Sequence, residues 1–222
     1  MGTPSVSDEQ VLTARAAWEL VGGLSNTSKM PCESWGLSPQ RCITGANLVE
    51  IDGSVCHDCY ARKGYYSFPR VRGAHERRLA ASDDPRWVEA MELLIRNQAS
   101  VHTPHFRWFD SGDLQSASML GRIADAARAT PEVQHWLPTK EHNLIEHYLA
   151  RNELPENLTV RLSAHHIDEP APGIHGLPTS TVHRDKPPIG IACPAYEDHP
   201  VTCGDCRHCW DKSIQNVSYR HH

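Results

Sequence analysis

Eight cysteines in two groups constrain the fold of this 222-residue chain more than any other feature of its sequence. The carboxyl-terminal group consists of Cys193, which precedes a proline, and Cys203, Cys206 and Cys209 at two-residue gaps. Four converging thiolates can bind one [4Fe–4S] cluster, although the Cys-Pro stands here before the close run, the reverse of the common bacterial order. The chain is therefore expected to fold so that Cys193 lies close to Cys203, Cys206 and Cys209.

The second group consists of Cys32, Cys42, Cys56 and Cys59. The close pair Cys56 and Cys59 can bind one metal from a single turn. The other two lie in residues 24–55, a stretch rich in Ser, Asn, Pro and Gly that shows no sustained period and is predicted to be a long irregular loop anchored by metal ligation. Soft thiolates suit zinc and iron–sulfur clusters alike. We favour two [4Fe–4S] clusters, with zinc and unligated buried thiols as the alternatives.

Composition excludes several classes of protein. Hydrophobic content of 39% with 22% charged residues is typical of a globular protein, and no apolar run approaches the ~20 residues that span a bilayer. The amino end lacks the pattern of a secretory signal, which predicts a reducing cytoplasm and no membrane contact. A net charge of −5 gives no general attraction to nucleic acid. The terminal His221 and His222 are given no role.

Apolar periodicity predicts strands and helices in alternation. The predicted helices are 7–21 (capped by Ser7), 69–82, 84–98, 115–129, 142–151 and a short one ending near 214, and the predicted strands are 105–109, 133–137, 158–162, 181–183 and a buried one at 189–192. This order implies parallel pairing with right-handed crossovers. The predicted fold is α/β, a partial (β/α) barrel-like parallel sheet with Cys-rich cluster-binding loops at both ends.

The length fits one domain, 1–222. Within it we expect a helix and Cys-rich loop over 1–64, a β/α core over 65–192 and a carboxyl-terminal cluster segment over 193–222.

Polar residues follow three of the predicted strands. They are Asp110, Ser111, Gly112 and Asp113 after the first, Thr139 and Lys140 after the second, and Ser163, His165 and His166 after the third. Carboxyl ends of parallel strands form one rim, where such folds keep their sites. The candidate catalytic residues are Asp110, Asp113, Lys140 and His165, and the candidate cofactor-binding residues are Asp110, Ser111, Gly112 and Ser163. Any single one of them is equally well explained as a helix cap or turn residue.

An arginine-rich stretch over Arg70–Arg78 is the one candidate surface for binding an anionic partner. It is either a solvated helix face or a surface that contacts nucleic acid or an anionic cofactor.

Five segments of the chain resemble the gene product 88 proteins of bacteriophages. They are 26–32, 56–64, 106–113, 136–140 and 203–210. This resemblance implies a phage origin and hence the cytoplasm of a host cell. More loosely, the cysteine segment followed by strand–helix units with polar strand ends is similar to radical S-adenosylmethionine (SAM) enzymes, whose barrel holds a three-cysteine cluster and the cofactor at the carboxyl ends of its strands.

The chain departs from that superfamily in the spacing of its cysteines. The usual Cys-x3-Cys-x2-Cys is absent, because Cys42 and Cys56 stand far apart, and Cys32 is a potential fourth ligand. If Cys32 ligates, the amino-terminal cluster is closed and serves electron transfer or structure. If it does not, Cys42, Cys56 and Cys59 become the catalytic three, residues 110–113 contact the cofactor's amino group, and the carboxyl-terminal cluster is auxiliary.

Two functions follow. The first is a redox or radical-SAM-like enzyme with an electron donor and an unidentified substrate. The second is a zinc-stabilised module without catalytic activity that binds nucleic acid or a host factor through Arg70–Arg78.

Overall fold

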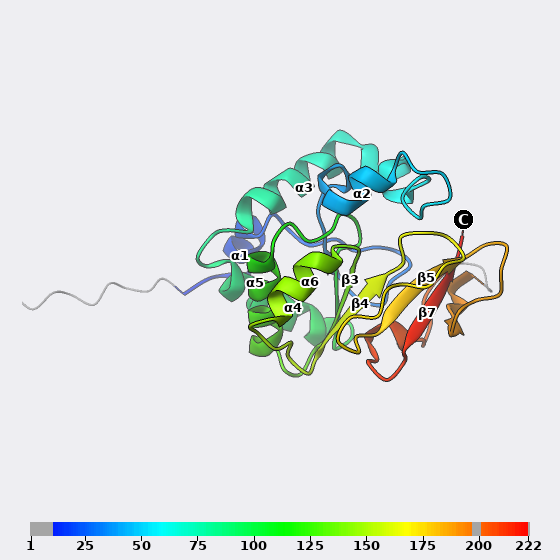
Figure 1. Ribbon diagram of the computed structural model, residues 1–222. Coiled ribbons are helices and arrows are strands. Elements are labelled where there is room, and N and C mark those ends of the chain that lie inside the picture. The colour runs from blue at the N-terminus through cyan, green and yellow to red at the C-terminus, as the bar shows by residue number, and fades with distance from the viewer. Residues whose placement is uncertain (1–10, 197–200, 222) are drawn as a thin grey trace, which may run out of the picture.

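The computed structural model describes residues 11–196 and 201–221. In this part of the chain seven strands form one open sheet in which all neighbours are parallel (Figure 1). In spatial order they are β1 (Ser34–Trp35), β2 (His105–Trp108), β3 (Gln134–Thr139), β4 (Leu158–Ser163), β5 (Thr179–His183), β7 (Asn216–Arg220) and β6 (Ile191–Ala192). Because parallel strands all end at the same side, the sheet has one edge that carries every carboxyl end, called the carboxyl edge below.

Within the described residues six α-helices accompany the sheet. They are α1 (Ala14–Leu20), α2 (Ile43–Leu48), α3 (Pro69–Ala81), α4 (Trp87–Val101), α5 (Ala117–Ala129) and α6 (His142–Leu149). Helices α1, α4, α5 and α6 pack side by side on one face, whereas α2 and α3 lie above the sheet in the view of Figure 1.

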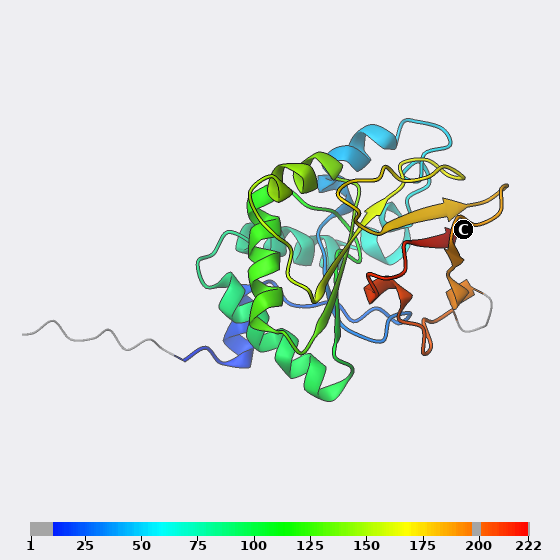
Figure 2. The same cartoon turned by 60° about the horizontal axis from the view of Figure 1, so that its bottom comes forward.

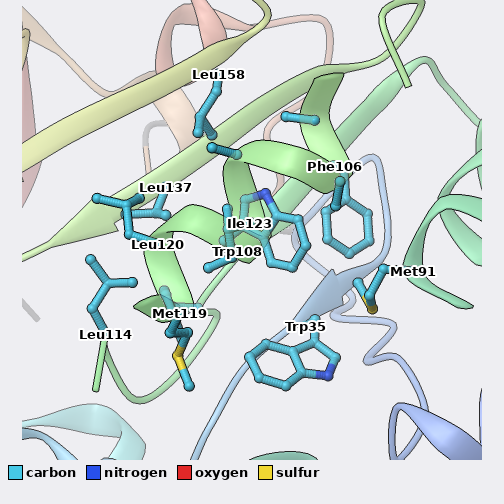
Figure 3. Close-up of a cluster of buried hydrophobic side chains, with 14 of the residues drawn as sticks. Trp35, Met91, Phe106, Trp108, Leu114, Met119, Leu120, Ile123, Leu137 and Leu158 are labelled. Carbon is cyan, nitrogen blue, oxygen red and sulfur yellow. The ribbon is translucent and has the colours of Figure 1, made fainter. Parts of the chain in front are cut away.

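The main core fills the space between the sheet and α4 and α5. Phe106 and Trp108 alternate with Arg107 along β2, so the two aromatic rings share the helix-covered face. Figure 3 shows Trp35, Phe106 and Trp108 packed among aliphatic side chains of α5 and β3, and all three residues are fully buried. A large apolar core of this kind fixes the sheet and therefore the positions of the strand ends.

The opposite face of the sheet is covered by the carboxyl-terminal segment, drawn in orange and red in Figure 2. There a smaller cluster joins Trp136 of β3, Val217 of β7 and Trp210, and the ring centroids of the two tryptophans are 5.3 Å apart. Two cysteines, Cys32 and Cys209, are buried in the same cluster. The sheet thus separates an apolar helix layer from a layer that contains thiols.

The predicted α/β class and parallel sheet are confirmed, as are the long helices 69–82, 84–98, 115–129 and 142–151 and the strands 105–109, 133–137 and 158–162, each to within a few residues. Of the predicted helix 7–21, the described part forms α1, which Thr13 caps by accepting a hydrogen bond from the Ala16 N–H (3.2 Å), while Ser7 lies outside the described residues.

Three predictions of local structure are wrong. The stretch 189–192 contains only the two-residue edge strand β6, and Ile189 and Ile191 are each 39% exposed, because an edge strand has no second neighbour to cover it. The predicted final helix is a single 3-10 turn, His208–Trp210. It is followed by strand β7, and β1 and α2 lie in the stretch expected to be irregular.

Among the described residues no helix is both long enough and apolar enough to cross a bilayer.

Candidate functional site

Three of the cysteines come together at the carboxyl edge. Cys42 is the residue before α2, and Cys56 and Cys59 lie in the loop that follows it. The position that a Cβ of Gly45 would occupy is 3.6 Å from the Cys42 Sγ and 3.5 Å from the Cys56 Sγ, so the absence of a side chain at Gly45 leaves room between these sulfurs. Cys59 is close enough to raise the pKa of both other thiols. We call Cys42, Cys56 and Cys59 the rim thiols.

Residues after three strands hold the loop that carries the rim thiols. After β3, Glu141 accepts hydrogen bonds from the Thr44 N–H (2.8 Å) and hydroxyl (2.7 Å) at the start of α2. After β4, the His165 carbonyl accepts the Val55 N–H at 2.8 Å, directly before Cys56. These contacts place the cysteine loop over the ends of the central strands.

A third contact comes from the end of β2. The hydroxyl of Tyr60, the residue after Cys59, donates to the Asp110 carbonyl oxygen at 2.7 Å. Residues after all three strands therefore touch the cysteine loop. The predicted sets share one rim, since Asp113 accepts hydrogen bonds from Thr139 and Lys140, and the His165 Nε2 lies 3.2 Å from the Lys140 carbonyl oxygen.

Asp113 and Lys140 act on the rim thiols electrostatically. Burial raises the pKa of Cys42 and of Cys56, Asp113 raises both further, and Lys140 lowers both. A thiol whose pKa is raised stays protonated and inert at neutral pH unless a metal or a cation favours the thiolate. Cys42 and Cys56 therefore need such a partner to become ligands.

Asp113 also joins two strand ends. It accepts hydrogen bonds from the Thr139 hydroxyl (2.6 Å), the Lys140 N–H (2.8 Å) and the Leu114 N–H (2.8 Å). Burial nevertheless raises its pKa to about 6, and these three donors act in the opposite direction. Its oxygens are thus engaged in fixing β2 against β3.

Asp110 presents a different environment. It is 2% exposed, its Oδ2 accepts a hydrogen bond from the Tyr66 hydroxyl at 3.2 Å, and its Oδ1 has no hydrogen-bond partner within the described chain. A Cβ at Gly36 would collide with that Oδ1. Phe109 before it adopts φ 54°, a strained conformation for a bulky residue that is characteristic of functional turns. Asp110 is therefore the strand-end acid with an unused acceptor.

The other predicted site residues are engaged within the protein. The Ser111 hydroxyl donates to the Leu37 carbonyl at 2.8 Å, and Gly112 at φ 75° packs where a Cβ would lie 2.7 Å from Leu37. Ser163 Oγ lies 3.1 Å from Ser180 Oγ.

The His165 ring stacks on the His142 ring, with centroids 4.5 Å apart, and its Nε2 lies 3.2 Å from the Lys140 carbonyl oxygen. The stack stands at the same rim as Lys140.

The structure separates Cys32 from the rim thiols. Cys32 is 3% exposed and packs in the cluster that contains Cys209 and Trp210 on the opposite face of the sheet. Burial raises its pKa to about 12, Arg107 lowers it and Cys203 raises it. The Cys203 N–H donates to the Lys29 carbonyl at 3.0 Å, which ties the carboxyl-terminal run to the segment before Cys32. The eight cysteines thus divide into three and five, not into four and four.

The five cysteines of the second set are Cys32, Cys193, Cys203, Cys206 and Cys209, which we call the inner thiols. Arg161 of β4, 0% exposed, holds the loop of Cys203–Cys209 by donating to the carbonyls of His208 (2.7 Å), Cys209 (3.0 Å), Asp211 (2.7 Å) and Ile214 (2.8 Å). It also donates to the Thr179 carbonyl of β5 at 3.2 Å. The indole N–H of Trp210 donates to the Phe106 carbonyl at 2.9 Å. The inner thiols are therefore fixed to the sheet through main-chain groups.

Arg107 lies between the two thiol sets. Its guanidinium is 4.5 Å from the centre of the Trp136 ring, and its Nη1 is 3.6 Å from the Met30 Sδ. It lowers the pKa of Cys32, Cys203 and Cys209 and interacts with Tyr60 and Asp110 at the rim. Arg107 is half-buried, and a cation in this position favours thiolates on the inner side.

Within residues 11–196 and 201–221, no three Cys, His, Asp or Glu side chains are close enough together to hold one metal ion. A zinc ion with Zn–S bonds of about 2.3 Å brings its sulfurs to roughly 3.8 Å from one another. A [4Fe–4S] cluster is a larger body that takes its thiolates at separate irons, so its sulfurs stand farther apart. The described residues present grouped thiols, not a finished ligand set for a single ion.

Sequence reasoning missed several residues that build these regions: Tyr60, Tyr66, Arg107, Glu141 and Arg161. Glu141 reads as an ordinary residue at the start of a helix, and Arg161 as an interruption of an apolar strand. The one available signal was the charge itself, since arginine within a predicted buried strand requires partners for its five N–H groups.

A comparison with protein families gives a match to the model of "Gene product 88" over residues 13–212. The chain belongs to the gene product 88 family. The match spans both thiol sets and every strand of the sheet except β7, so the resemblance of the motifs to the phage family is confirmed. No curated protein and no solved structure matches the chain, and the similarity to radical SAM enzymes stays a prediction.

Proposed function

We propose that this gene product 88 protein is an iron–sulfur enzyme with two [4Fe–4S] clusters, and that the cluster on the rim thiols binds S-adenosylmethionine. The observation that carries the proposal is the position of Cys32 beside Cys209 and Trp210, away from Cys42. It leaves three thiols at the carboxyl edge. Three thiolates on a four-iron cluster leave one iron free for an external ligand, and such a cluster supplies one-electron reduction of the SAM sulfonium.

The rim residues fit this group in two respects. Gly45 leaves a space between the Cys42 and Cys56 sulfurs that any larger residue would fill. Asp110 keeps one buried carboxylate oxygen that has no hydrogen-bond partner among the residues the structure describes, beside the loop that carries Cys59. A carboxylate in this position would accept a hydrogen bond from the ammonium group of SAM. Lys140 lowers the pKa of Cys42 and so favours its thiolate, and Asp113 fixes the position of Lys140 by accepting a hydrogen bond from its main-chain N–H.

The inner thiols would hold the second cluster, which serves electron transfer or structure. None of the eight cysteines is in a disulfide, and free thiols persist in a reducing compartment. We therefore place the protein in the cytoplasm of the host, together with an electron donor. The substrate of the enzyme is not specified by the rim residues.

The test is anaerobic reconstitution of the wild type, Cys56→Ala and Cys32→Ala with iron and sulfide. The wild type is expected to bind about eight irons, Cys32→Ala, which keeps three rim thiols and four inner thiols, also about eight, and Cys56→Ala about four. After reduction with dithionite, added SAM should change the electron paramagnetic resonance spectrum of the wild type and of Cys32→Ala, but not of Cys56→Ala. Both proteins that respond should also release methionine and 5′-deoxyadenosine.

A SAM response that survives in Cys56→Ala would place the cofactor elsewhere. Colourless protein with two zinc ions per chain would overturn the cluster assignment and favour the zinc-stabilised binding module.

A further inference from the structure

Residues 60–72 form an exposed surface of aromatic and basic side chains beside the rim site. Its members are Tyr60, Arg62, Lys63, Tyr65, Tyr66, Phe68, Arg70 and Arg72. No acidic residue occurs within this run. We call it the aromatic–basic surface, and the cluster chemistry proposed above makes no use of its exposed side chains.

The aromatic rings of this surface are unusually open to solvent. Tyr65 is 80% exposed and Phe68 52%, and their ring centroids lie 5.3 Å apart. Neighbouring exposed rings that find no apolar cover within their own chain are typical of a contact surface. Tyr60 is 48% exposed although its hydroxyl is held by the Asp110 carbonyl, so its ring connects this surface with the rim.

A cavity of about 540 Å³ opens within the surface. Its wall includes Tyr60, Tyr65, Tyr66 and Lys63, and also Asp58 and His221. Its volume lies in the range of small-molecule sites, and an aromatic wall offers stacking to a planar group of nucleobase size.

The charge of the surface is local. The whole chain has a net charge of −5, yet Arg62, Arg70 and Arg72 are exposed and form no salt bridge within the described residues. Lys63 is paired with Asp58, with 2.9 Å between Nζ and Oδ1. Helix α3 also begins here at Pro69, and its amino end adds partial positive charge. Positive charge interleaved with open rings complements a partner that is both polyanionic and aromatic.

We propose that the aromatic–basic surface binds single-stranded nucleic acid, with bases stacked on Tyr65 and Phe68 and phosphates at Arg62, Arg70 and Arg72. Single strands fit better than a duplex, because duplex bases are already stacked on one another and hidden from protein rings. Arg78, expected to belong to a basic face, is 4% exposed and donates to the carbonyls of Gly23 and Gly36, so the contact lies at the amino end of α3.

The experiment measures fluorescence anisotropy of a labelled oligonucleotide of about 12 nucleotides, single-stranded or annealed to its complement, at several salt concentrations. Binding to the single strand is expected to weaken about 5- to 150-fold in Tyr65→Ala and to persist in Tyr65→Phe. Arg70→Gln should lower the slope of log K against log salt by about 0.7. Arg151→Gln, an exposed arginine at the end of α6, is the matched control and should change neither value.

Three results would overturn the proposal. The first is that the protein binds the duplex as tightly as the single strand or more tightly. The second is an unchanged affinity of Tyr65→Ala for the single strand, which would mean that charge attraction alone makes the contact. The third is tighter binding of the protein to phosphatidylserine vesicles than to the oligonucleotide. The measurement needs neither SAM nor reductant, so its failure is independent of the proposed enzyme activity.

Discussion

The rim thiols and the inner thiols are held by different kinds of contact. The rim loop, which carries the rim thiols, is attached to strand ends by the Glu141 carboxylate and by the carbonyls of His165 and Asp110. Each of these residues makes one or two hydrogen bonds to the loop. The inner loop, which carries Cys203, Cys206 and Cys209, is fixed to the middle of the sheet by Arg161, which alone donates to four of its carbonyls, and by Trp210.

This difference predicts different mechanical properties. A loop held at several separate points on the rim can open locally, whereas a loop packed on tryptophan and a buried arginine opens only with the sheet. The rim is thus suited to binding and release of a ligand, and the inner region to a permanent group.

The largest expected effect comes from removing Arg161. Arg161→Met keeps the apolar volume but leaves buried carbonyls without donors, which should lower the free energy of unfolding by about 3–5 kcal/mol. Urea unfolding gives this value, and hydrogen exchange of residues 203–214 shows whether the inner loop is released. Arg151→Met, an exposed control, should stay within about 0.5 kcal/mol of the wild type. A loss below about 1 kcal/mol in Arg161→Met would mean that the inner loop is held by other contacts.

A smaller effect is expected from acid at the rim. Burial lowers the pKa of His142 to about 4, and His165 and Lys140 act in the same direction, whereas its unfolded value is near 6.5. Between these values the unfolded state binds a proton that the folded state does not. The stability that depends on neutral His142 is therefore fully present above pH 6.5 and declines by about 1–3 kcal/mol as the pH falls to 4.

The variant His142→Phe keeps a ring on His165 and removes this titration. Its stability should depend less steeply on pH than that of the wild type, while buried His135, whose pKa is also lowered, contributes equally to both. Limited proteolysis at pH 5 should cleave residues 42–60 before 203–214. Identical pH slopes for the two proteins would contradict the assignment to His142.

The smallest effect on stability is expected for Gly45→Ala. Alanine gains about 1 kcal/mol of helix propensity in α2, which offsets the 2.9 Å contact between its Cβ and the Cys42 Cβ. The new methyl group would nevertheless stand between the rim sulfurs, so the reconstituted protein should lose up to about four irons per chain. Gly173→Ala, where a Cβ meets nothing within 4 Å, is the control and should keep its iron. Full iron in Gly45→Ala would exclude a cluster between Cys42 and Cys56.

Much of the fold could be predicted from local sequence because its long elements are strongly periodic. Phe106 and Trp108 alternate with polar neighbours, and the apolar residues of α5 recur at helical spacing. The short strands could not be found in this way. Strand β1 has two residues and exists through its pairing with β2. Strand β7, Asn216–Arg220, is also short, and only Val217 and Tyr219 of its residues pack against the cluster that contains Cys209.

The candidate site was predicted in its parts but not in its assembly. Asp110, Lys140 and His165 were recognised because strand ends in a parallel sheet converge. Glu141 and Tyr60, which hold the cysteine loop to that rim, lack a sequence signal, since their partners are a hydroxyl and main-chain groups far along the chain.

The sequence by itself determined that eight thiols, an α/β alternation and three polar strand ends occur in one chain. Only the tertiary structure decided which thiols meet. Cys32 precedes β1 and Cys42 follows it, so the strand carries the chain from the amino side of the sheet to the carboxyl edge between them. Residues before and after a strand lie at opposite edges of the sheet. Cys32 and Cys42 are therefore near one another in sequence but far apart in the fold, where Cys32 lies with Cys203.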